Sequence, residues 1–257
     1  MILAFSNVKG GVGKTTSAVN LAAALAGSEL KVLLIDLDPQ GSAAYSVGVP
    51  VDSSGSSLTD VLLAREPLAE VLWETEISGL DVAVGGIELS QAELTLARRK
   101  QPARGLAKAL TTVRKSYDFV IIDCPPGLGL LTLIGLGASE AFVVPMTPHY
   151  LALEALARLF AGLERLPDEL RPDAKLLGIL LTMVDHRTRV TEEVCRLTRR
   201  RYPGQLFRTE IPVNVQLAEA PEYGRSIFNF QSWSPGALAY SRFGAEVLRR
   251  ARRQRLI

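Results

Sequence analysis

The strongest constraint on the fold of this chain is the segment 9–16, which reads KGGVGKTT. It follows the apolar run 2–5 and precedes a run with helical spacing, so the expected order is strand, loop and helix. Glycines allow backbone N–H groups to surround an anion, and the N-terminus of the following helix adds the positive end of its dipole. The segment therefore predicts a site for nucleotide phosphates.

Two lysines stand in this loop, and they have different expected roles. Lys14 should reach the β- and γ-phosphates, and the Thr15 hydroxyl should bind Mg²⁺. Position 8 is Val8, where the common form of the motif has glycine, so the loop departs from that form at the residue before Lys9. Lys9 could simply raise the local positive potential. The expected nucleotide contacts are Lys9, Gly10, Gly11, Val12, Gly13, Lys14, Thr15 and Thr16.

Acidic residues follow two other apolar runs. Asp36 and Asp38 come at the end of the run 32–35, and Asp123 ends the run 119–122. Alternation along a strand places Asp36 and Asp38 on the same side, where they can face the phosphates. Ligands of open α/β sheets bind at the carboxyl ends of the strands, which is where these acids lie. Each of them could instead cap a turn or a helix.

The order of elements predicts the fold class. Strand-like runs at 2–6, 31–36, 118–123, 141–146 and 175–182 alternate with segments of helical spacing. This is the pattern of a doubly wound α/β fold, a mostly parallel sheet flanked by helices. A chain of 257 residues with 47% hydrophobic residues can bury the core of one such domain. We expect a single domain over 1–257, with a basic C-terminal helix or tail at about 236–257.

Several motifs together resemble one known family. The box at 9–11 resembles the deviant Walker A box of the ParA/MinD family of P-loop ATPases, whose signature is the extra lysine. Segment 33–41 (LLIDLDPQG) is similar to the family's second motif in its ParA form, and 119–126 (FVIIDCPP) to its Walker B strand. Segments 178–185 and 211–215 resemble its nucleotide-base region. The motifs follow the family's order along almost the whole chain.

The resemblance implies an ATPase that uses Mg²⁺ and hydrolyses ATP to ADP and phosphate, with weak activity in the absence of DNA and a partner. Lys9 would cross a homodimer interface to the partner's nucleotide, and Asp38 would orient or activate the attacking water. Asp36 and Asp123 would hold Mg²⁺ through water, beside Thr15. The implied catalytic residues are Lys9, Lys14 and Asp38.

For the base, the resemblance implies contacts near two segments, while turn and packing roles stay open for these residues. Val213 and Gln216 stand where related sequences usually carry arginine, which puts in doubt the contacts of those arginines. The implied contacts are Met183, Asp185, Pro212 and Asn214.

Arginines are clustered although the net charge is only +2. Such clusters can neutralise phosphates without reading sequence, although each one alone is more often a solvated helix face. On a ParA-like chain, non-specific binding to double-stranded DNA is the better interpretation. The candidate DNA contacts are Arg199, Arg200, Arg225, Arg249 and Arg252.

The resulting hypothesis is a ParA/Soj-type partitioning ATPase in the cytoplasm, associated with the nucleoid and without a membrane partner. Mg-ATP would drive dimerisation and DNA binding, and hydrolysis stimulated by a ParB-like protein would reset the monomer. The cargo could be a chromosome or a plasmid. Segment 50–57 reads as a polar, mobile loop near the dimer or nucleotide face.

Three other functions remain as alternatives. A MinD-like membrane-associated regulator would use 246–257 as an amphipathic anchor, although this segment has few apolar residues among its arginines. An electron-transfer ATPase would need paired cysteines for an iron–sulfur cluster, and the two cysteines, Cys124 and Cys195, are far apart. A DNA-binding scaffold with little hydrolysis is disfavoured by the intact Asp38.

Overall fold

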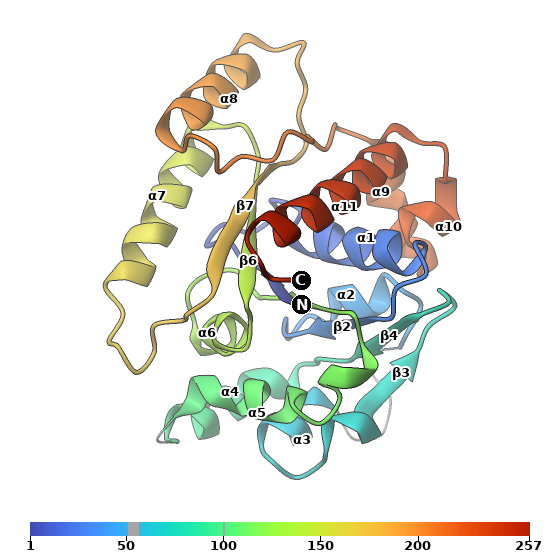
Figure 1. Cartoon of the computed structure of the whole chain (residues 1–257), viewed down its shortest axis with the longest axis vertical. Coiled ribbons are helices and arrows are strands. Elements are labelled where there is room, and N and C mark those ends of the chain that lie inside the picture. Colours follow the sequence, from blue (N-terminus) through green and yellow to red (C-terminus); the bar gives the residue numbers. More distant parts are fainter. Residues whose placement is uncertain (51–56, 100) are drawn as a thin grey trace.

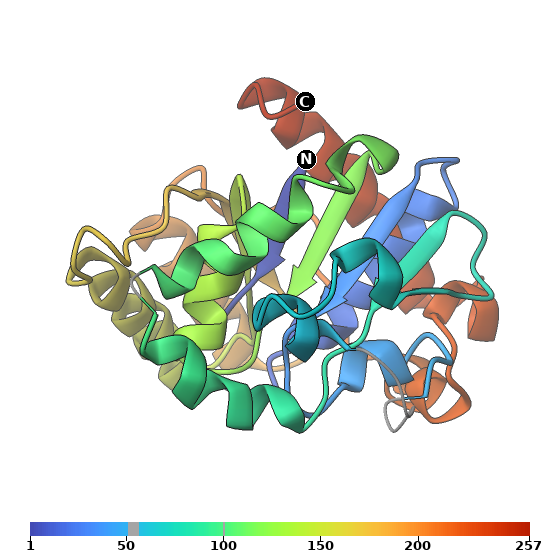
Figure 2. The same ribbon diagram turned by 90° about the horizontal axis from the view of Figure 1, so that it is seen from below.

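The computed structural model describes residues 1–50, 57–99 and 101–257, and it contains one sheet covered by helices on both faces (Figures 1 and 2). The loop expected at 50–57 therefore lies largely outside the described residues. The strands are β1 (Ile2–Phe5), β2 (Val32–Asp36), β3 (Leu72–Glu74), β4 (Leu80–Ala83), β5 (Phe119–Asp123), β6 (Ala141–Met146) and β7 (Lys175–Leu181).

The helices of the described residues are short except for four. These four are α1 (Lys14–Ala26), α7 (Tyr150–Glu164), α8 (Arg189–Arg201) and α11 (Pro235–Arg253). The others are α2 (Ser42–Tyr45), α3 (Leu58–Leu62), α4 (Glu88–Ala97), α5 (Gly105–Leu110), α6 (Leu130–Gly137), α9 (Val215–Glu219) and α10 (Ile227–Gln231). Single 3₁₀ turns are η1 (Leu68–Val71), η2 (Pro102–Arg104), η3 (Arg114–Ser116) and η4 (Ala220–Tyr223).

The strand order in the described sheet is β3-β4-β2-β5-β1-β6-β7. All neighbouring pairs are parallel except β3 and β4, which are antiparallel. The predicted doubly wound α/β class is confirmed, and the five predicted strands are all present. The strands β3 and β4 were not predicted, because each is too short to show a strand period on its own.

The two faces of the sheet carry separate apolar cores. One core packs α1 and α11 against strand residues such as Leu34 and Ile121. The other packs α3, α4, α5, α6 and α7 against the opposite face, for example against Ile35 and Ile122. Every residue of the central strands β2 and β5 is buried, because helices cover both sides. This packing fixes the carboxyl ends of the strands.

The segment after α8 covers the outer edge of β7. The N–H of Ile179 donates to the carbonyl oxygen of Gln205 at 2.9 Å, and the N–H of Phe207 donates to that of Ile179 at 2.9 Å. Further along, the N–H of Ile211 donates to the Leu181 carbonyl at 2.9 Å. The segment 205–213 thus continues the hydrogen bonding of the sheet without forming a regular strand.

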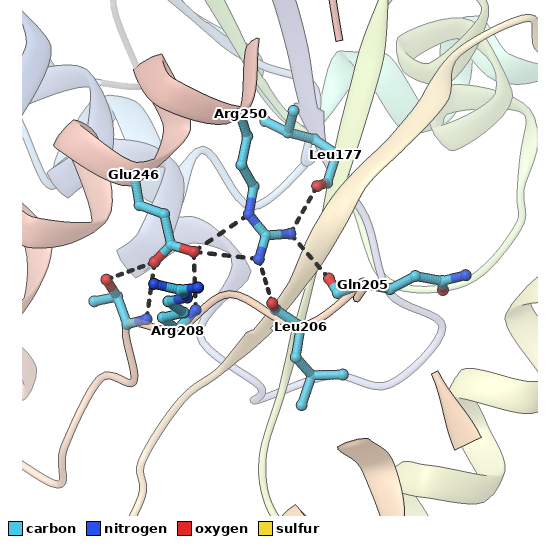
Figure 3. Close-up of polar contacts among 7 residues, drawn as sticks. Leu177, Gln205, Leu206, Arg208, Glu246 and Arg250 are labelled. Carbon is cyan, nitrogen blue, oxygen red and sulfur yellow. Dashed lines mark hydrogen bonds and ion pairs between the residues drawn. The ribbon is translucent and has the colours of Figure 1, made fainter. Parts of the chain in front are cut away.

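A buried ion pair on α11 holds this edge segment in place (Figure 3). Glu246 accepts hydrogen bonds from the backbone N–H groups of Arg208 and Thr209, both at 2.9 Å. Arg250 pairs with Glu246 at 3.2 Å, and its guanidinium donates to the carbonyl oxygens of Leu177 and Gln205 and also of Leu206. Arg250 is therefore part of the fold, although the sequence shows it as one of several similar arginines in a basic tail.

Among the described residues, no helix is both long enough and apolar enough to cross a bilayer.

Candidate nucleotide site

The glycine-rich loop between β1 and α1 has the backbone conformation that its glycines predict. Gly11 and Gly13 adopt φ values of +68° and +77°, and Gly13 is the N-cap residue of α1. Residues with a Cβ rarely adopt this left-handed conformation. No atom lies within 4 Å of the point where a Cβ of Gly11 would be, so one side of the loop faces open space. The loop can therefore surround a ligand.

Two buried side chains bind the backbone of the loop by hydrogen bonds, and neither was predicted from the sequence. The Thr182 hydroxyl, at the end of β7, donates to the carbonyl oxygen of Val12 at 2.8 Å. Asn7 accepts from the N–H of Lys9 at 3.1 Å and donates to the Pro145 carbonyl at 2.7 Å. A signal for Asn7 was available, because it is an amide directly after an apolar strand and before the motif.

Lys14 is buried within the loop, with 6% of its surface exposed. Its ammonium donates to the carbonyl oxygen of Lys9 at 3.3 Å, which is one of three possible hydrogen bonds. Burial lowers the pKa of Lys14, while the nearby carboxylates of Asp123 and Asp38 act in the opposite direction. An anion bound in the loop would use the remaining donors and favour the charged form.

Asp123 and Thr15 form the part of the site that fits a divalent cation. The Thr15 hydroxyl donates to one carboxylate oxygen of Asp123 at 2.6 Å. The other oxygen, Oδ1, is buried and has no hydrogen-bond partner in the described part of the chain. Burial and the neighbouring Asp36 raise the pKa of Asp123 well above its usual range. Hard cations such as Mg²⁺ prefer oxygen ligands of this kind, often through water.

Asp36 lies beside Asp123 in the register of β2 and β5, but its side chain caps a helix. Its two oxygens accept the N–H groups of Asp38 at 3.1 Å, Ala43 at 2.8 Å and Ala44 at 3.0 Å. Burial raises its pKa to about 7, although these hydrogen bonds act in the opposite direction. The capping role is thus directly visible, and the role of Asp36 toward Mg²⁺ stays a prediction.

Asp38 and Lys9 are less enclosed than Lys14. Asp38 is half-buried, and one of its oxygens accepts the N–H of Gln40 at 3.0 Å. Lys9 is also half-buried, and no hydrogen bond or ion pair of its ammonium occurs among the described residues. Both side chains therefore remain available to a ligand or to a second subunit.

The two segments predicted for the base lie side by side. The N–H of Val184 donates to the carbonyl oxygen of Ile211 at 3.0 Å, and Val184 forms a parallel bridge with Pro212. Met183 has a positive φ of 52° and is 46% exposed. The structure thus brings Met183 and Pro212 together beyond the end of β7.

The polar side chains of these segments make hydrogen bonds within the chain, but Asn214 Oδ1 is buried and has no hydrogen-bond partner among the described residues. Asp185 accepts two hydrogen bonds from the Arg187 guanidinium, at 2.8 and 2.7 Å, and Arg187 holds its pKa at about 2. The Asn214 amide donates to the side-chain oxygen of Gln216 at 2.7 Å. Gln216 therefore positions Asn214. The base contacts of Asp185 and Asn214 stay predictions.

The predicted DNA contacts do not all have the same surroundings. Arg199 on α8 forms an ion pair with Glu210, so its charge is partly compensated. Arg200 is exposed next to it, and Arg225 is exposed before α10. Arg249 and Arg252 are exposed near the C-terminal end of α11.

A groove lined by five arginines runs between α11 and the edge segment of β7; we call it the arginine groove. Two adjoining hollows of about 610 and 460 Å³ share Arg208, Glu246 and Arg249 in their linings. Its acidic residues, Glu246 and Glu210, are paired with Arg250 and Arg199. Besides Arg250, which is bonded within the network described above, the arginines of the groove are Arg208, Arg242, Arg249 and Arg253.

Sequence comparisons match nearly the whole chain to partitioning proteins. A family model described as an AAA domain matches residues 1–176. The chromosome-partitioning ATPase Soj of Thermus thermophilus is 42% identical over 250 residues, which cover 96% of this chain and 95% of the relative. The chromosome partitioning protein ParA of Myxococcus xanthus is 39% identical over 249 residues, covering 97% and 88%.

Solved structures show the same fold. A Mycobacterium smegmatis protein, described as cobyrinic acid a,c-diamide synthase with bound ADP and magnesium, is 34% identical and superposes with a TM-score of 0.83. The match covers 96% of this chain and 94% of that protein. The septum site-determining protein MinD of Pyrococcus horikoshii, complexed with Mg-ADP, has a TM-score of 0.76 over 96% of this chain and 95% of its own. Its identity of 23% supports the fold alone.

Proposed function

The chain belongs to the ParA/Soj family of partitioning ATPases, and we propose that it binds Mg-ATP, dimerises and binds DNA without sequence preference. Hydrolysis, stimulated by a ParB-like protein, would return it to the monomer. The protein would work in the cytoplasm on the nucleoid. The cargo would be a chromosome or a plasmid.

The observation that carries the nucleotide proposal is the arrangement of Lys14, Thr15 and Asp123. Lys14 has unused donors inside a glycine loop, and the free oxygen of Asp123 lies beside the Thr15 hydroxyl. Lys14 would bind the β- and γ-phosphates, while Thr15 and Asp123 would hold Mg²⁺ directly and through water. Mg²⁺, when bound, neutralises charge that develops on the phosphate oxygens.

Hydrolysis would use the two side chains at the open side of the loop. Asp38 would orient the attacking water, because it follows β2 at the phosphate edge and has a free carboxylate oxygen. Lys9 would reach the nucleotide of the second subunit and stabilise the charge on the γ-phosphate, as an arginine finger does. ATP would thus join the two subunits until it is hydrolysed.

The arginine groove supports the DNA proposal. Arginines on α11 and on the edge segment, with nearby acids already paired, provide the positive charge that phosphates require. A two-fold symmetric dimer would present the groove twice and so increase the number of phosphate contacts. This would make DNA affinity depend on the nucleotide state.

The packing of α11 disfavours the membrane alternative. Val247 is buried, and Leu248 and Leu256 pack against the core. Of the apolar residues in 246–257, Ile257 is the one that is largely exposed, with 48% of its surface accessible. An interfacial helix needs a broad apolar face toward the lipid, and here that face is turned inward. We therefore favour DNA over a lipid surface.

The test is binding to random-sequence duplex DNA at two salt concentrations, with no nucleotide, ADP, ATP or a slowly hydrolysed ATP analogue. We expect binding in the ATP-like states only, falling steeply with salt. Liposome flotation with ATP is the parallel measurement. Flotation without DNA binding would favour the membrane function, and negligible turnover even with DNA and partner would favour a scaffold.

A further inference from the structure

Trp233 is the most exposed large hydrophobic residue in the described part of the chain, with 85% of its surface accessible. It stands in the short turn between α10 and α11. The next residue, Ser234, is buried and caps α11 by accepting the N–H of Ala237 at 3.1 Å. The N–H of Ser234 also donates to the Gln231 carbonyl at 3.0 Å. The backbone that follows Trp233 is therefore held by hydrogen bonds of Ser234. The exposure of the indole is thus a consequence of the fold.

The indole lies at one end of the arginine groove. It lines a third hollow, of about 350 Å³, together with Leu238, Pro212 and Arg242. This hollow shares Arg242, Glu210 and Ala239 with the neighbouring one, which contains Arg208 and Arg249. The hollows therefore form one continuous surface along α11, from Trp233 to Arg253.

The spacing of the arginines on α11 suits a phosphate backbone. Arg242, Arg249 and Arg253 are seven and then four residues apart, so they share one face of the helix. At about 1.5 Å per residue the three positions span roughly 16 Å, which is the length of about five base pairs of duplex DNA. The groove can thus contact several phosphates in sequence.

An aromatic residue adds a different type of contact at the end of such a groove. Exposed tryptophan is unusual on a monomer and is enriched in binding sites, where its large apolar surface loses contact with water. A duplex presents apolar surface on its deoxyriboses and base edges, next to the phosphates. Many proteins that bind the minor groove place apolar side chains between its base steps, next to this surface.

We propose that Trp233 is an apolar anchor for duplex DNA bound in the arginine groove. The arginines bind phosphates, and the indole packs against deoxyribose and base edges of the same duplex. This inference rests on the proposed DNA-binding function and names a contact that this function does not require.

The chain provides its own reporter for the test. It has two tryptophans, so Trp73→Phe leaves Trp233 as the single indole. We expect random-sequence duplex DNA, added with a slowly hydrolysed ATP analogue, to change the emission of Trp233. Trp233→Ala should weaken DNA binding by about fivefold or more, while the salt slope stays unchanged, because an apolar contact releases no counterions.

A matched control is Tyr223→Ala. Tyr223 is also aromatic and is 65% exposed, but it does not line the arginine groove. Its variant should bind DNA like the wild type. Trp233→Phe should retain part of the affinity, because a smaller aromatic ring remains.

Three results would overturn the inference. DNA binding could leave the emission of Trp233 unchanged, and the Trp233→Ala variant could bind DNA like the wild type. Together these results would show that Trp233 does not contact DNA, while the proposed function would stand. An emission change on addition of nucleotide without DNA would place Trp233 at the bound nucleotide, because Pro212, a predicted base contact, lines the same hollow. If that change depends on protein concentration, it would place Trp233 between two subunits. If single-stranded DNA binds more tightly than the duplex and changes the Trp233 emission more, the indole stacks on bases and does not pack against a duplex. Absence of DNA binding in every nucleotide state would contradict the proposed function itself.

Discussion

Thr182 and Val12 connect the last strand of the sheet to the phosphate loop. The Thr182 hydroxyl donates a buried 2.8 Å hydrogen bond to the Val12 carbonyl, across 170 residues of sequence. The methyl group of Thr182 also lies 3.7 Å from the Cβ position of Gly13. Met183, the next residue, belongs to the segment predicted to contact the base. Thr182 thus connects the phosphate loop to the segment that is predicted to contact the base.

We predict that Thr182→Val weakens nucleotide binding. The shape is conserved, but the buried Val12 carbonyl loses its donor, which costs about 1–2 kcal/mol, or roughly five- to thirtyfold in affinity. Thr182→Ser should keep most of the nucleotide affinity, because serine retains the hydroxyl donor. Titration with a fluorescent ATP analogue measures the effect. The control is Thr198→Val, which removes a buried hydroxyl that donates to Val194 within α8. Equal affinities of Thr182→Val and wild type would leave Thr182 without a role in positioning.

Lys9→Ala should separate nucleotide binding from dimerisation. The ammonium of Lys9 makes no hydrogen bond or ion pair within the described part of its own chain, so its removal should change ATP affinity by less than about threefold. ATP-dependent dimerisation and turnover should be lost. Sedimentation velocity with and without ATP measures the oligomer. Normal ATP-stimulated dimerisation of the variant would refute the role of Lys9 across the interface.

Asp38→Ala should keep ATP binding and lose hydrolysis, because the carboxylate that orients water is absent. General-base or water-orienting groups typically contribute on the order of 10²-fold or more to the rate. The dimer should remain on DNA after ATP is removed. Release followed by fluorescence anisotropy measures this, and equal release rates for the variant and the wild type would contradict the assignment.

Replacing both Arg249 and Arg253 by alanine should reduce the salt dependence of DNA binding. Each lost phosphate contact lowers the slope of log K against log salt by about 0.9, so the pair should lower it by about two. ATP affinity should not change. The matched control replaces Arg65 and Arg158, which are exposed and lie outside the groove. An unchanged slope in the groove variant would mean that this face of α11 is only solvated.

Glu246→Gln should reveal a pH-dependent part of the stability. Burial acts to raise the pKa of Glu246, but the N–H groups of Arg208 and Thr209 and the Arg250 guanidinium outweigh it and lower the pKa below 4.5. The carboxylate therefore stabilises the folded state above this pH, and the stabilisation disappears as the pH falls through the folded-state pKa.

At pH 7 the glutamine variant should lose about 2–4 kcal/mol of unfolding free energy, since one partner of a buried ion pair is removed. Urea unfolding at pH 7, 5 and 3.5 measures the difference from wild type, which should narrow at the lowest pH. If the difference in unfolding free energy between variant and wild type is the same at all three pH values, the charge of Glu246 does not contribute and the loss comes from hydrogen bonding alone.

The sequence predicted those parts of the structure that depend on local patterns. The strands β2 and β5 are continuous apolar runs that end in aspartate, and both their positions and the meeting of Asp36 with Asp123 follow from parallel pairing. In contrast, β3 is three residues long and its side chains are partly exposed, so its existence depends on pairing with β4.

Contacts made by the fold were not visible in the sequence. Thr182 meets Val12 because β7 ends beside the loop, and no spacing within either segment indicates this. Similarly, Arg250 and Arg249 are neighbours in one basic run and both line the groove, but Arg250 is bonded to Glu246 and to backbone carbonyls, whereas Arg249 is exposed. The burial of one face of α11 decides which arginine is free, and this burial is a property of the folded chain.

The coverage of the β7 edge limits how two copies of this chain can associate. On one side of the sheet the segment 205–213 occupies the hydrogen-bonding groups of Ile179 and Leu181. On the other side the edge strand β3 has only three residues and ends in Glu74. Short, charged or covered edges resist strand addition and amyloid-like growth. A sheet continuous across two subunits is thus disfavoured, and the proposed dimer would have to form through surfaces other than the sheet edges.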